Sequence, residues 1–299
     1  MASLRDIRKH ISSVRNIRQI TYAMKMVAAA RIKRAQGSIL ASRPFASRME
    51  TMLKDLYGEL GEEDFRTSPA YPIFEQRKDH GPIGLCVVTA DKGLCGSFNN
   101  NILKASLAWL ARHRGRKVRL ALVGRKSRDF FHRLRGLDLD IEMELTGIFP
   151  KASYAHAELL AGKMLDSYAA CSVCGYTVVY NEFKSMMSQR VVEAQLLPLS
   201  RHILLDPSCG PLCHNFAFEP GKAEFLGALL PRYVKAQVYR ILLESQAAEL
   251  AARMSAMESA SNNASDLISD LTLKLNKMRQ AMITTELNEI VGGAEALGG

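Results

Sequence analysis

The sequence lacks any apolar run long enough to cross a membrane. Its longest apolar stretches, such as the one from Ile83 to Ala90, fall well short of the roughly 18 to 20 residues that a spanning helix needs. The first residues alternate charged with apolar side chains, so the continuous apolar block of a secretory signal is also missing. We therefore expect no direct membrane span.

Common catalytic motifs are missing as well. Gly93-x-x-Gly96 is only part of a G-x-G-x-x-G fingerprint, and Gly124-Arg125-Lys126-Ser127 has the wrong glycine-to-lysine spacing for a P-loop. Neither a G-x-S-x-G elbow nor an H-E-x-x-H zinc helix occurs, and the seven histidines are scattered singly. We expect no catalytic residue and no bound cofactor.

Glycine and proline are nearly absent from the first 57 residues, where only Gly37 and Pro44 occur. Apolar residues recur there at steps of three or four, which is typical of one face of a helix. The pattern predicts a helix from Ala2 to about Tyr57, about 80 Å long at 1.5 Å per residue. The predicted apolar face consists of Leu4, Ile7, Ile11, Val14, Ile17, Ile20, Met24 and Val27.

A second long helix is predicted from Lys222 to Val291, about 105 Å by the same rise. Pro231 is expected to kink or divide it, and Gly292-Gly293 is expected to end it. Small or apolar residues follow a heptad spacing, which indicates a partner helix. The predicted seam is Leu243, Ala247, Leu250, Met254, Met257, Ser261, Ala264, Ile268, Leu271, Leu275, Met278, Met282 and Thr285.

The region between the two helices alternates strand and helix patterns, which predicts a mainly parallel, Rossmann-like α/β sheet. Expected strands are Ile83–Ala90, Lys117–Val123 and Leu139–Leu145, followed by a hairpin of Tyr176–Phe183 and Arg190–Leu197. The chain therefore divides into a helix at 1–57, a linker at 58–82, an α/β domain at 83–220 and a helix at 221–299. The fold class is α/β, with the two terminal helices forming a long antiparallel coiled coil.

Acidic residues are scarce at the start of the chain. Residues 1 to 48 hold eleven basic side chains and one acid, Asp6, which gives +10, the same as the net charge of the whole chain. The remaining residues therefore balance. A basic helix of this kind indicates a nucleic acid, an anionic lipid or an acidic protein surface as its partner.

The cysteines form one ambiguous group. Cys171-x-x-Cys174 precedes the first hairpin strand and Cys209-x-x-x-Cys213 follows the second, so a hairpin would bring both pairs to one end of the sheet. Four such thiols suit a structural zinc ion or a redox-labile disulfide. Buried, reduced cysteines are the simpler alternative.

Three blocks of sequence resemble the gamma subunit, the central rotor shaft, of F-type ATP synthases. The first is Ile20 to Ala29, ITYAMKMVAA, and the second is Thr89 to Gly96, TADKGLCG. The third, Arg279 to Ala294, RQAMITTELNEIVGGA, is the most specific. The resemblance covers the whole chain and implies a non-catalytic shaft that transmits rotation to the catalytic subunits.

The resemblance also implies partners and contact residues. The partners are the alpha and beta subunits of the catalytic hexamer, the epsilon subunit and the ring of c subunits, with no nucleic acid. The location is the cytoplasmic face of a bacterial inner membrane, or else the mitochondrial matrix face. A nucleic-acid-binding coiled coil is the alternative. The implied contact residues are Met24, Lys25, Glu219, Arg253, Arg279, Gln280, Thr284 and Glu286. Glu219 lies where members of the family contact the membrane ring, and its neighbour Phe218 replaces an aromatic hydroxyl that is often found there.

Overall fold

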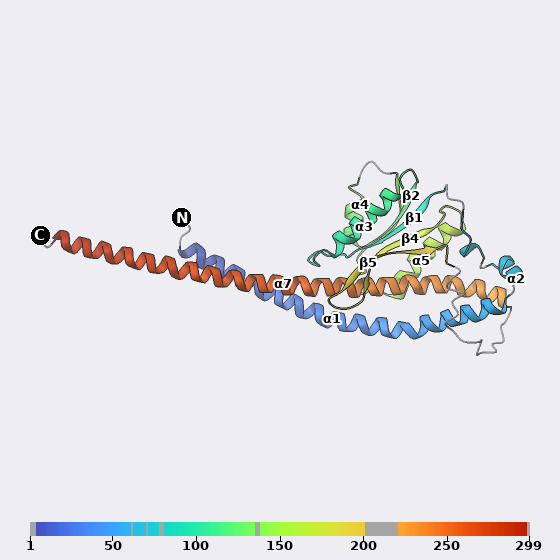
Figure 1. Ribbon diagram of the computed structural model, residues 1–299, viewed down its shortest axis with the longest axis horizontal. Coiled ribbons are helices and arrows are strands. Elements are labelled where there is room, and N and C mark those ends of the chain that lie inside the picture. Colours follow the sequence, from blue (N-terminus) through green and yellow to red (C-terminus); the bar gives the residue numbers. More distant parts are fainter. Residues whose placement is uncertain are drawn as a thin grey trace. The chain divides into compact units, whose positions relative to one another are not determined.

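The computed structural model describes residues 4–60, 62–69, 71–77, 81–134, 138–200 and 221–297. Contacts divide the chain into a terminal unit, Met1–Ala29 with Arg253–Gly299, and a sheet unit, Ala30–Ala252. The elements, labelled in Figure 1, are α1 (Leu4–Glu59), α2 (Glu62–Thr67), η1 (Tyr71–Ile73), β1 (Ile83–Val88), α3 (Phe98–Arg112), β2 (Val118–Val123), α4 (Arg125–Phe131), β3 (Leu139–Leu145), α5 (Tyr154–Ala169), β4 (Tyr176–Phe183), β5 (Gln189–Leu197) and α7 (Lys222–Leu297). The predicted α/β class is confirmed, and the four-part division of the chain stays a prediction.

The sheet has five strands in the order β3-β2-β1-β4-β5. The first four run parallel, and β5 pairs antiparallel with β4, so that Tyr180 lies opposite Val192. Helical crossovers connect the parallel strands, whereas a tight turn suffices for the last pair. The Rossmann-like, mainly parallel sheet expected from the sequence is therefore confirmed.

Both faces of the sheet are covered by helices. On β1, Leu85 and Val87 join the core beneath α3 and α4, whereas Cys86 and Val88 join the core beneath α5. This alternation follows from the two-residue period of a strand. Strands buried on both faces read as continuous apolar runs, which is why the sequence pattern located them correctly. Figure 1 shows α3 and α4 on the opposite side of the sheet from α5.

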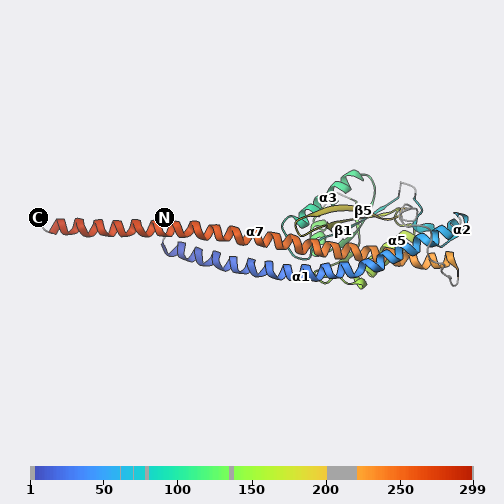
Figure 2. The ribbon, with the colours of Figure 1, turned by 60° about the horizontal axis from the view of Figure 1, so that its bottom comes forward.

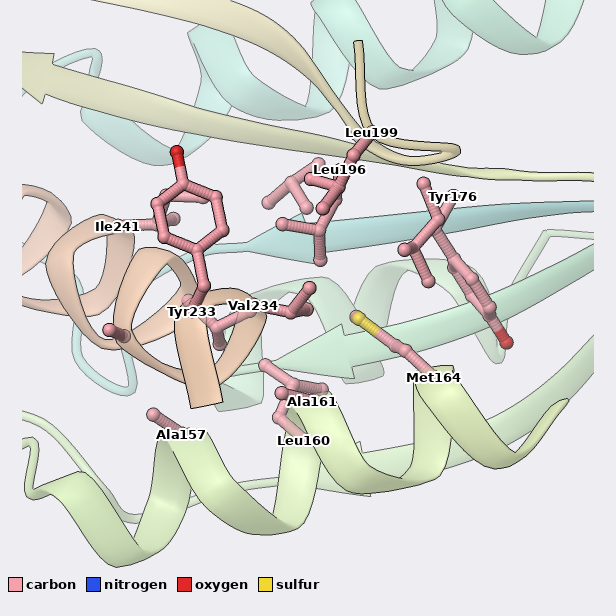
Figure 3. Close-up of a cluster of buried hydrophobic side chains, with 14 of the residues drawn as sticks. Ala157, Leu160, Ala161, Met164, Tyr176, Leu196, Leu199, Tyr233, Val234 and Ile241 are labelled. Atoms are coloured by element: carbon pink, nitrogen blue, oxygen red, sulfur yellow. The ribbon is translucent and has the colours of Figure 1, made fainter. Parts of the chain in front are cut away.

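The larger core lies between the sheet, α5 and the first part of α7, with the C-terminal third of α1 contributing Met49, Leu53 and Leu56. In Figure 3, Leu160 and Met164 of α5 lie near Val234 of α7. All three side chains are at most 1% exposed. Burying each such side chain contributes roughly 1.5 to 3 kcal/mol, so this part of α7 is an integral part of the sheet unit.

Two boundaries predicted for α7 are wrong, whereas the kink at Pro231, predicted as the alternative to a division, stays a prediction. Pro231 does not divide it, because α7 is one helix from Lys222 to Leu297. The buried neighbours Leu230 and Val234 hold both sides of the proline in the core, which offsets its missing hydrogen bond. Gly292 and Gly293 do not end the helix either. Each glycine costs only about 1 kcal/mol relative to alanine, and helix-forming residues follow them.

A half-buried carboxylate, Glu244 on α7, lies within this unit. Burial raises its pKa, and the nearby Glu182 raises it further, while Arg240 and a hydrogen bond from Tyr180 lower it. Arg240 Nε lies 3.9 Å from Glu244 Oε1. Within the described part of the chain, the other carboxylate oxygen, Oε2, has no hydrogen-bond partner. Keeping the Glu244 carboxylate ionised therefore lowers the stability of the folded chain.

Replacing Glu244 by glutamine should make unfolding less sensitive to pH. A raised pKa means that the folded state binds more protons than the unfolded state, so the free energy of unfolding falls as pH rises above the ordinary value of 4.5. Glu244→Gln removes this loss. The free energy of unfolding of the variant, relative to wild type, should therefore be higher at pH 7 than at pH 4. Urea unfolding across this range measures the difference, and parallel pH profiles would contradict the prediction.

Candidate functional site: a basic helix pair

In the terminal unit, α1 and α7 pack together through an apolar cluster. Ile7, Ile11 and Val14 of α1 are buried against Ala264 and Leu271 of α7, each 5 to 9% exposed. The cluster is completed by the half-buried Ile268, Leu275 and Met278. The predicted pairing of the two chain ends is therefore confirmed.

Beyond Val14 the seam on α1 differs from the predicted one. Ile17, Ile20 and Val27 were expected to face α7, but they are 52%, 60% and 50% exposed. The heptad steps of four and three that begin at Ile7 continue through positions 18, 21, 25 and 28 instead. Two successive steps of three, from Val14 to Ile17 to Ile20, rotate those side chains away from the partner helix.

Polar residues therefore occupy the middle of the seam: Arg18 is exposed, and Thr21 and Lys25 are half-buried. Lys25 Nζ lies 2.6 Å from Glu258 Oε1 on α7. Ile7 shares an apolar cluster with Leu271, whereas Lys25, further along α1, pairs with Glu258, earlier on α7, so the helices run antiparallel. The side chains of the ion pair are 28% and 48% exposed, so it stabilises the pair by at most about 1 kcal/mol.

The rotation of α1 exposes an apolar and basic surface. Exposed apolar side chains lie among exposed basic ones such as Arg15. At about 100° per residue, Ile17, Ile20 and Val27 lie on one side of the seam, and Tyr22 and Met26 lie on the other. Large apolar residues left exposed in this way mark surfaces that a partner covers. We call this group the α1 patch: Ile17, Ile20, Tyr22, Met26 and Val27.

The end of α7 is exposed on every side. All residues from Arg279 to Gly292 are exposed, and Figures 1 and 2 both show α7 continuing past the start of α1. The prediction that Met282 and Thr285 belong to the seam is therefore wrong, because no part of α1 described by the structure reaches them. We call the exposed apolar residues of this segment the α7 tip: Met282, Ile283, Leu287, Ile290 and Val291.

The structure places the predicted contact residues in different surroundings. Met24, Lys25 and Arg253 are half-buried, and Arg253 has interactions within the chain. On the exposed end of α7, Thr284 Oγ1 donates a hydrogen bond to the Gln280 carbonyl at 3.0 Å. Arg279, Gln280, Thr284 and Glu286 are all exposed. Glu219 and Phe218 lie outside the described residues. Contacts of these residues with another subunit stay predictions.

The loop after β1 is built around a carboxylate, a role that the sequence patterns missed. Asp91 Oδ1 accepts hydrogen bonds from the backbone N–H of Arg125 at 3.1 Å and of Gly147 at 2.7 Å. Its Oδ2 accepts from Phe149 N at 3.0 Å. The Asp91 carboxylate thus binds backbone amides at the start of α4, which follows β2, and in the segment after β3. No local pattern could have indicated this role, because the amides that Asp91 binds belong to residues 34 to 58 positions further along the chain.

The predicted four-cysteine site is only half described. Cys171 is exposed, Cys174 is half-buried, and both are thiols rather than disulfide partners. Cys209 and Cys213 lie outside the described residues, so the zinc or disulfide prediction stays a prediction. Within the described ranges, no group of three or more histidine, cysteine, aspartate or glutamate side chains is placed to hold a metal ion. Across the same ranges, no helix has the length and apolar character required to cross a bilayer.

Comparison with solved structures identifies the class of protein that has this fold. A Tetrahymena thermophila mitochondrial ATP synthase, solved as its central stalk and c-ring, contains a chain that matches with a TM-score of 0.60 and 27% identity, covering 81% of this chain and 99% of the other. A chain of the Euglena gracilis mitochondrial ATP synthase has the same fold, with a TM-score of 0.65 at 19% identity over 98% and 94% of the two chains. The architecture is that of an ATP synthase central stalk.

Sequence comparison specifies the subunit. A family model described as ATP synthase matches residues 3–297. The ATP synthase gamma chains of Elusimicrobium minutum and Anaeromyxobacter dehalogenans are 43% and 44% identical over 99% of this chain and 99% and 100% of theirs. The chain belongs to the ATP synthase gamma chain family. Nothing in these comparisons supports the nucleic-acid-binding alternative.

Proposed function

We propose that this chain is the rotating shaft of a proton-translocating F-type ATP synthase and that it acts mechanically rather than catalytically. The observation that carries this proposal is the antiparallel helix pair of the terminal unit, whose exposed surface is apolar and basic, in a chain of the gamma family. Two helices joined by a packed apolar cluster resist bending better than one, which suits an element that transmits torque.

The proposed contacts are with the alpha and beta subunits of the catalytic hexamer. The excess charge of +10 within residues 1 to 48 favours an acidic partner, and the α1 patch and the α7 tip supply apolar contact area. Met24 and Lys25 lie next to the α1 patch. On the same segment of α7, Arg279 and Gln280 precede the α7 tip, and Thr284 and Glu286 lie between its apolar residues. Arg253 completes the proposed set.

Coupling then follows from differential contact. The terminal unit is not symmetric, because its part of α1 carries a net positive charge and the α1 patch, whereas only α7 forms the tip. A surrounding ring of subunits would meet a different surface at each angle of rotation. A surface that binds one conformation of a catalytic subunit better than another shifts the population toward that conformation.

The proposed lower partners are the epsilon subunit and the c-subunit ring, with Glu219 as a proposed contact residue. Membership of the family places the chain in a membrane-associated complex, and its similar proteins include many bacterial gamma chains. The finer location that we propose is the cytoplasmic face of the bacterial inner membrane, attached through partners.

Removing the α7 tip should impair coupling without unfolding the chain. Truncation after Met278 leaves the apolar cluster of the terminal unit complete, so the isolated chain should lose only the helix content of the removed segment and its unfolding midpoint should change little. Assembly with alpha and beta subunits, or ATP-driven proton pumping by the assembled complex, should fall about tenfold, because five apolar contact residues are lost.

A shorter truncation provides the matched control. Ending the chain after Gly292 keeps all five residues of the α7 tip, so assembly and pumping should stay close to wild type. If truncation after Met278 left both assembly and pumping unchanged, the proposed shaft function of α7 would be refuted.

A further inference from the structure

Helix α5 ends at a residue whose backbone conformation favours glycine, yet that residue is Cys171. Its N–H donates to the Tyr168 carbonyl at 3.0 Å, and the N–H of Ser172 donates to the Ser167 carbonyl at 3.0 Å. This pair of bonds is the Schellman motif that ends many helices. The φ angle of Cys171 is 55°, a left-handed conformation that costs a non-glycine residue about 1 kcal/mol. Backbone stability alone would favour glycine here.

A second cysteine follows three residues later on the same short connection between α5 and β4. Cys174 is half-buried, and its backbone N–H donates to the Pro82 carbonyl at 2.7 Å, just before β1. Its sulfur packs so closely on Gly81 that a Cβ at Gly81 would lie 2.4 Å from it. The connection thus presents one exposed thiol, Cys171, and one partly shielded thiol, Cys174.

We propose that Cys171 and Cys174 are a site of reversible oxidation, at which a small-molecule disulfide converts the two thiols to an intramolecular disulfide. This inference does not depend on the proposed shaft function. A C-x-x-C pair in a turn suits this chemistry because only two residues separate the thiols, so closing the bond requires little ordering of the chain.

The reaction proceeds by two exchanges. The Cys171 thiol loses its proton, and its sulfur attacks one sulfur of the small disulfide, which releases one small thiol and leaves a mixed disulfide on Cys171. The Cys174 sulfur then attacks the Cys171 sulfur, and the second small thiol leaves. The two protein thiols lose two electrons and two protons in total, and the small disulfide is reduced to two thiols.

Two other cysteines serve as internal references. Cys86 and Cys95 are each 1% exposed, and burial raises the pKa of Cys86 to about 12. A buried, protonated thiol does not exchange. An oxidant in solution that reaches only exposed thiols should therefore modify Cys171 and leave Cys86 and Cys95 reduced.

The test uses the purified full chain, oxidised glutathione, alkylation with N-ethylmaleimide after unfolding, and peptide mass mapping. We expect the peptide carrying Cys171 and Cys174 to lose two hydrogens and to escape alkylation, whereas Cys86 and Cys95 are fully alkylated. In Cys174→Ser, glutathione should stay attached to Cys171. In Cys171→Ser, modification of Cys174 should be at least about tenfold slower, because its thiol is partly shielded.

A double variant, Cys209→Ser with Cys213→Ser, separates this pairing from its competitors. The disulfide should form as readily in this variant as in wild type. A bond between Cys171 or Cys174 and either of the other two cysteines would overturn the assignment. So would complete alkylation of Cys171 after exposure to glutathione disulfide, or the absence of a glutathione adduct in Cys174→Ser.

Discussion

Replacing Ile11 by aspartate should separate α1 from α7 in the terminal unit. Ile11 is 6% exposed, within the cluster that also contains Val14 and Leu271. The substitution removes apolar contacts and places a carboxylate among apolar side chains, which together cost about 3 kcal/mol or more. Hydrogen exchange of the α1 amides should accelerate by about a hundredfold, and assembly with alpha and beta subunits should be lost with it.

The same change at Ile20 is the matched control. Ile20 lies on the same helix but is 60% exposed, so Ile20→Asp should alter the stability of the isolated chain by no more than about 0.5 kcal/mol. Because Ile20 belongs to the α1 patch, assembly should still weaken. Equal exchange rates in the two variants would show that the seam does not follow the register described above, and unchanged assembly of Ile20→Asp would contradict the proposed role of the α1 patch.

The second large effect is expected at Gly124, where β2 passes into α4. Its φ angle is 89°, and a Cβ there would lie 2.2 Å from the Thr89 carbonyl oxygen. That strand end cannot move away easily, since Thr89 Oγ1 donates to the Val123 carbonyl at 3.1 Å and accepts from Ser127 N at 2.8 Å. Gly124→Ala should therefore destabilise the sheet unit by about 4 kcal/mol or more, measured by urea unfolding.

Substitution of Gly115 is the control that separates the cost of backbone strain from the cost of the steric clash with Thr89. Its φ angle is 88°, almost the same as that of Gly124, but an added Cβ would meet nothing within 4 Å. Gly115→Ala should cost only about 1 kcal/mol, the strain of a left-handed alanine. If both variants lost the same free energy, the close approach of Gly124 to Thr89 would have no energetic consequence.

Sequence patterns alone predicted the order of elements, the parallel sheet and the pairing of the two chain ends. These features depend on local periodicity: Leu85 to Val88 read as a continuous apolar strand, and Ile7, Ile11 and Val14 repeat at helical steps. Both patterns are short-range properties of the chain, so they can be read without knowing what lies opposite them. The imbalance of charge at the start of the chain is equally local.

Only the tertiary structure decided which apolar residues face the partner helix, where the seam stops, and what Asp91 and Gly124 do. Ile17 and Ile20 are as apolar as Ile11, but steps of three carry them off the face that Ile11 shares with α7. Met282 continues the heptad spacing, yet it lies beyond the apolar cluster with α1. Sequence spacing specifies where a side chain points on its own helix, whereas burial also requires a second surface opposite, and that surface comes from a distant part of the chain.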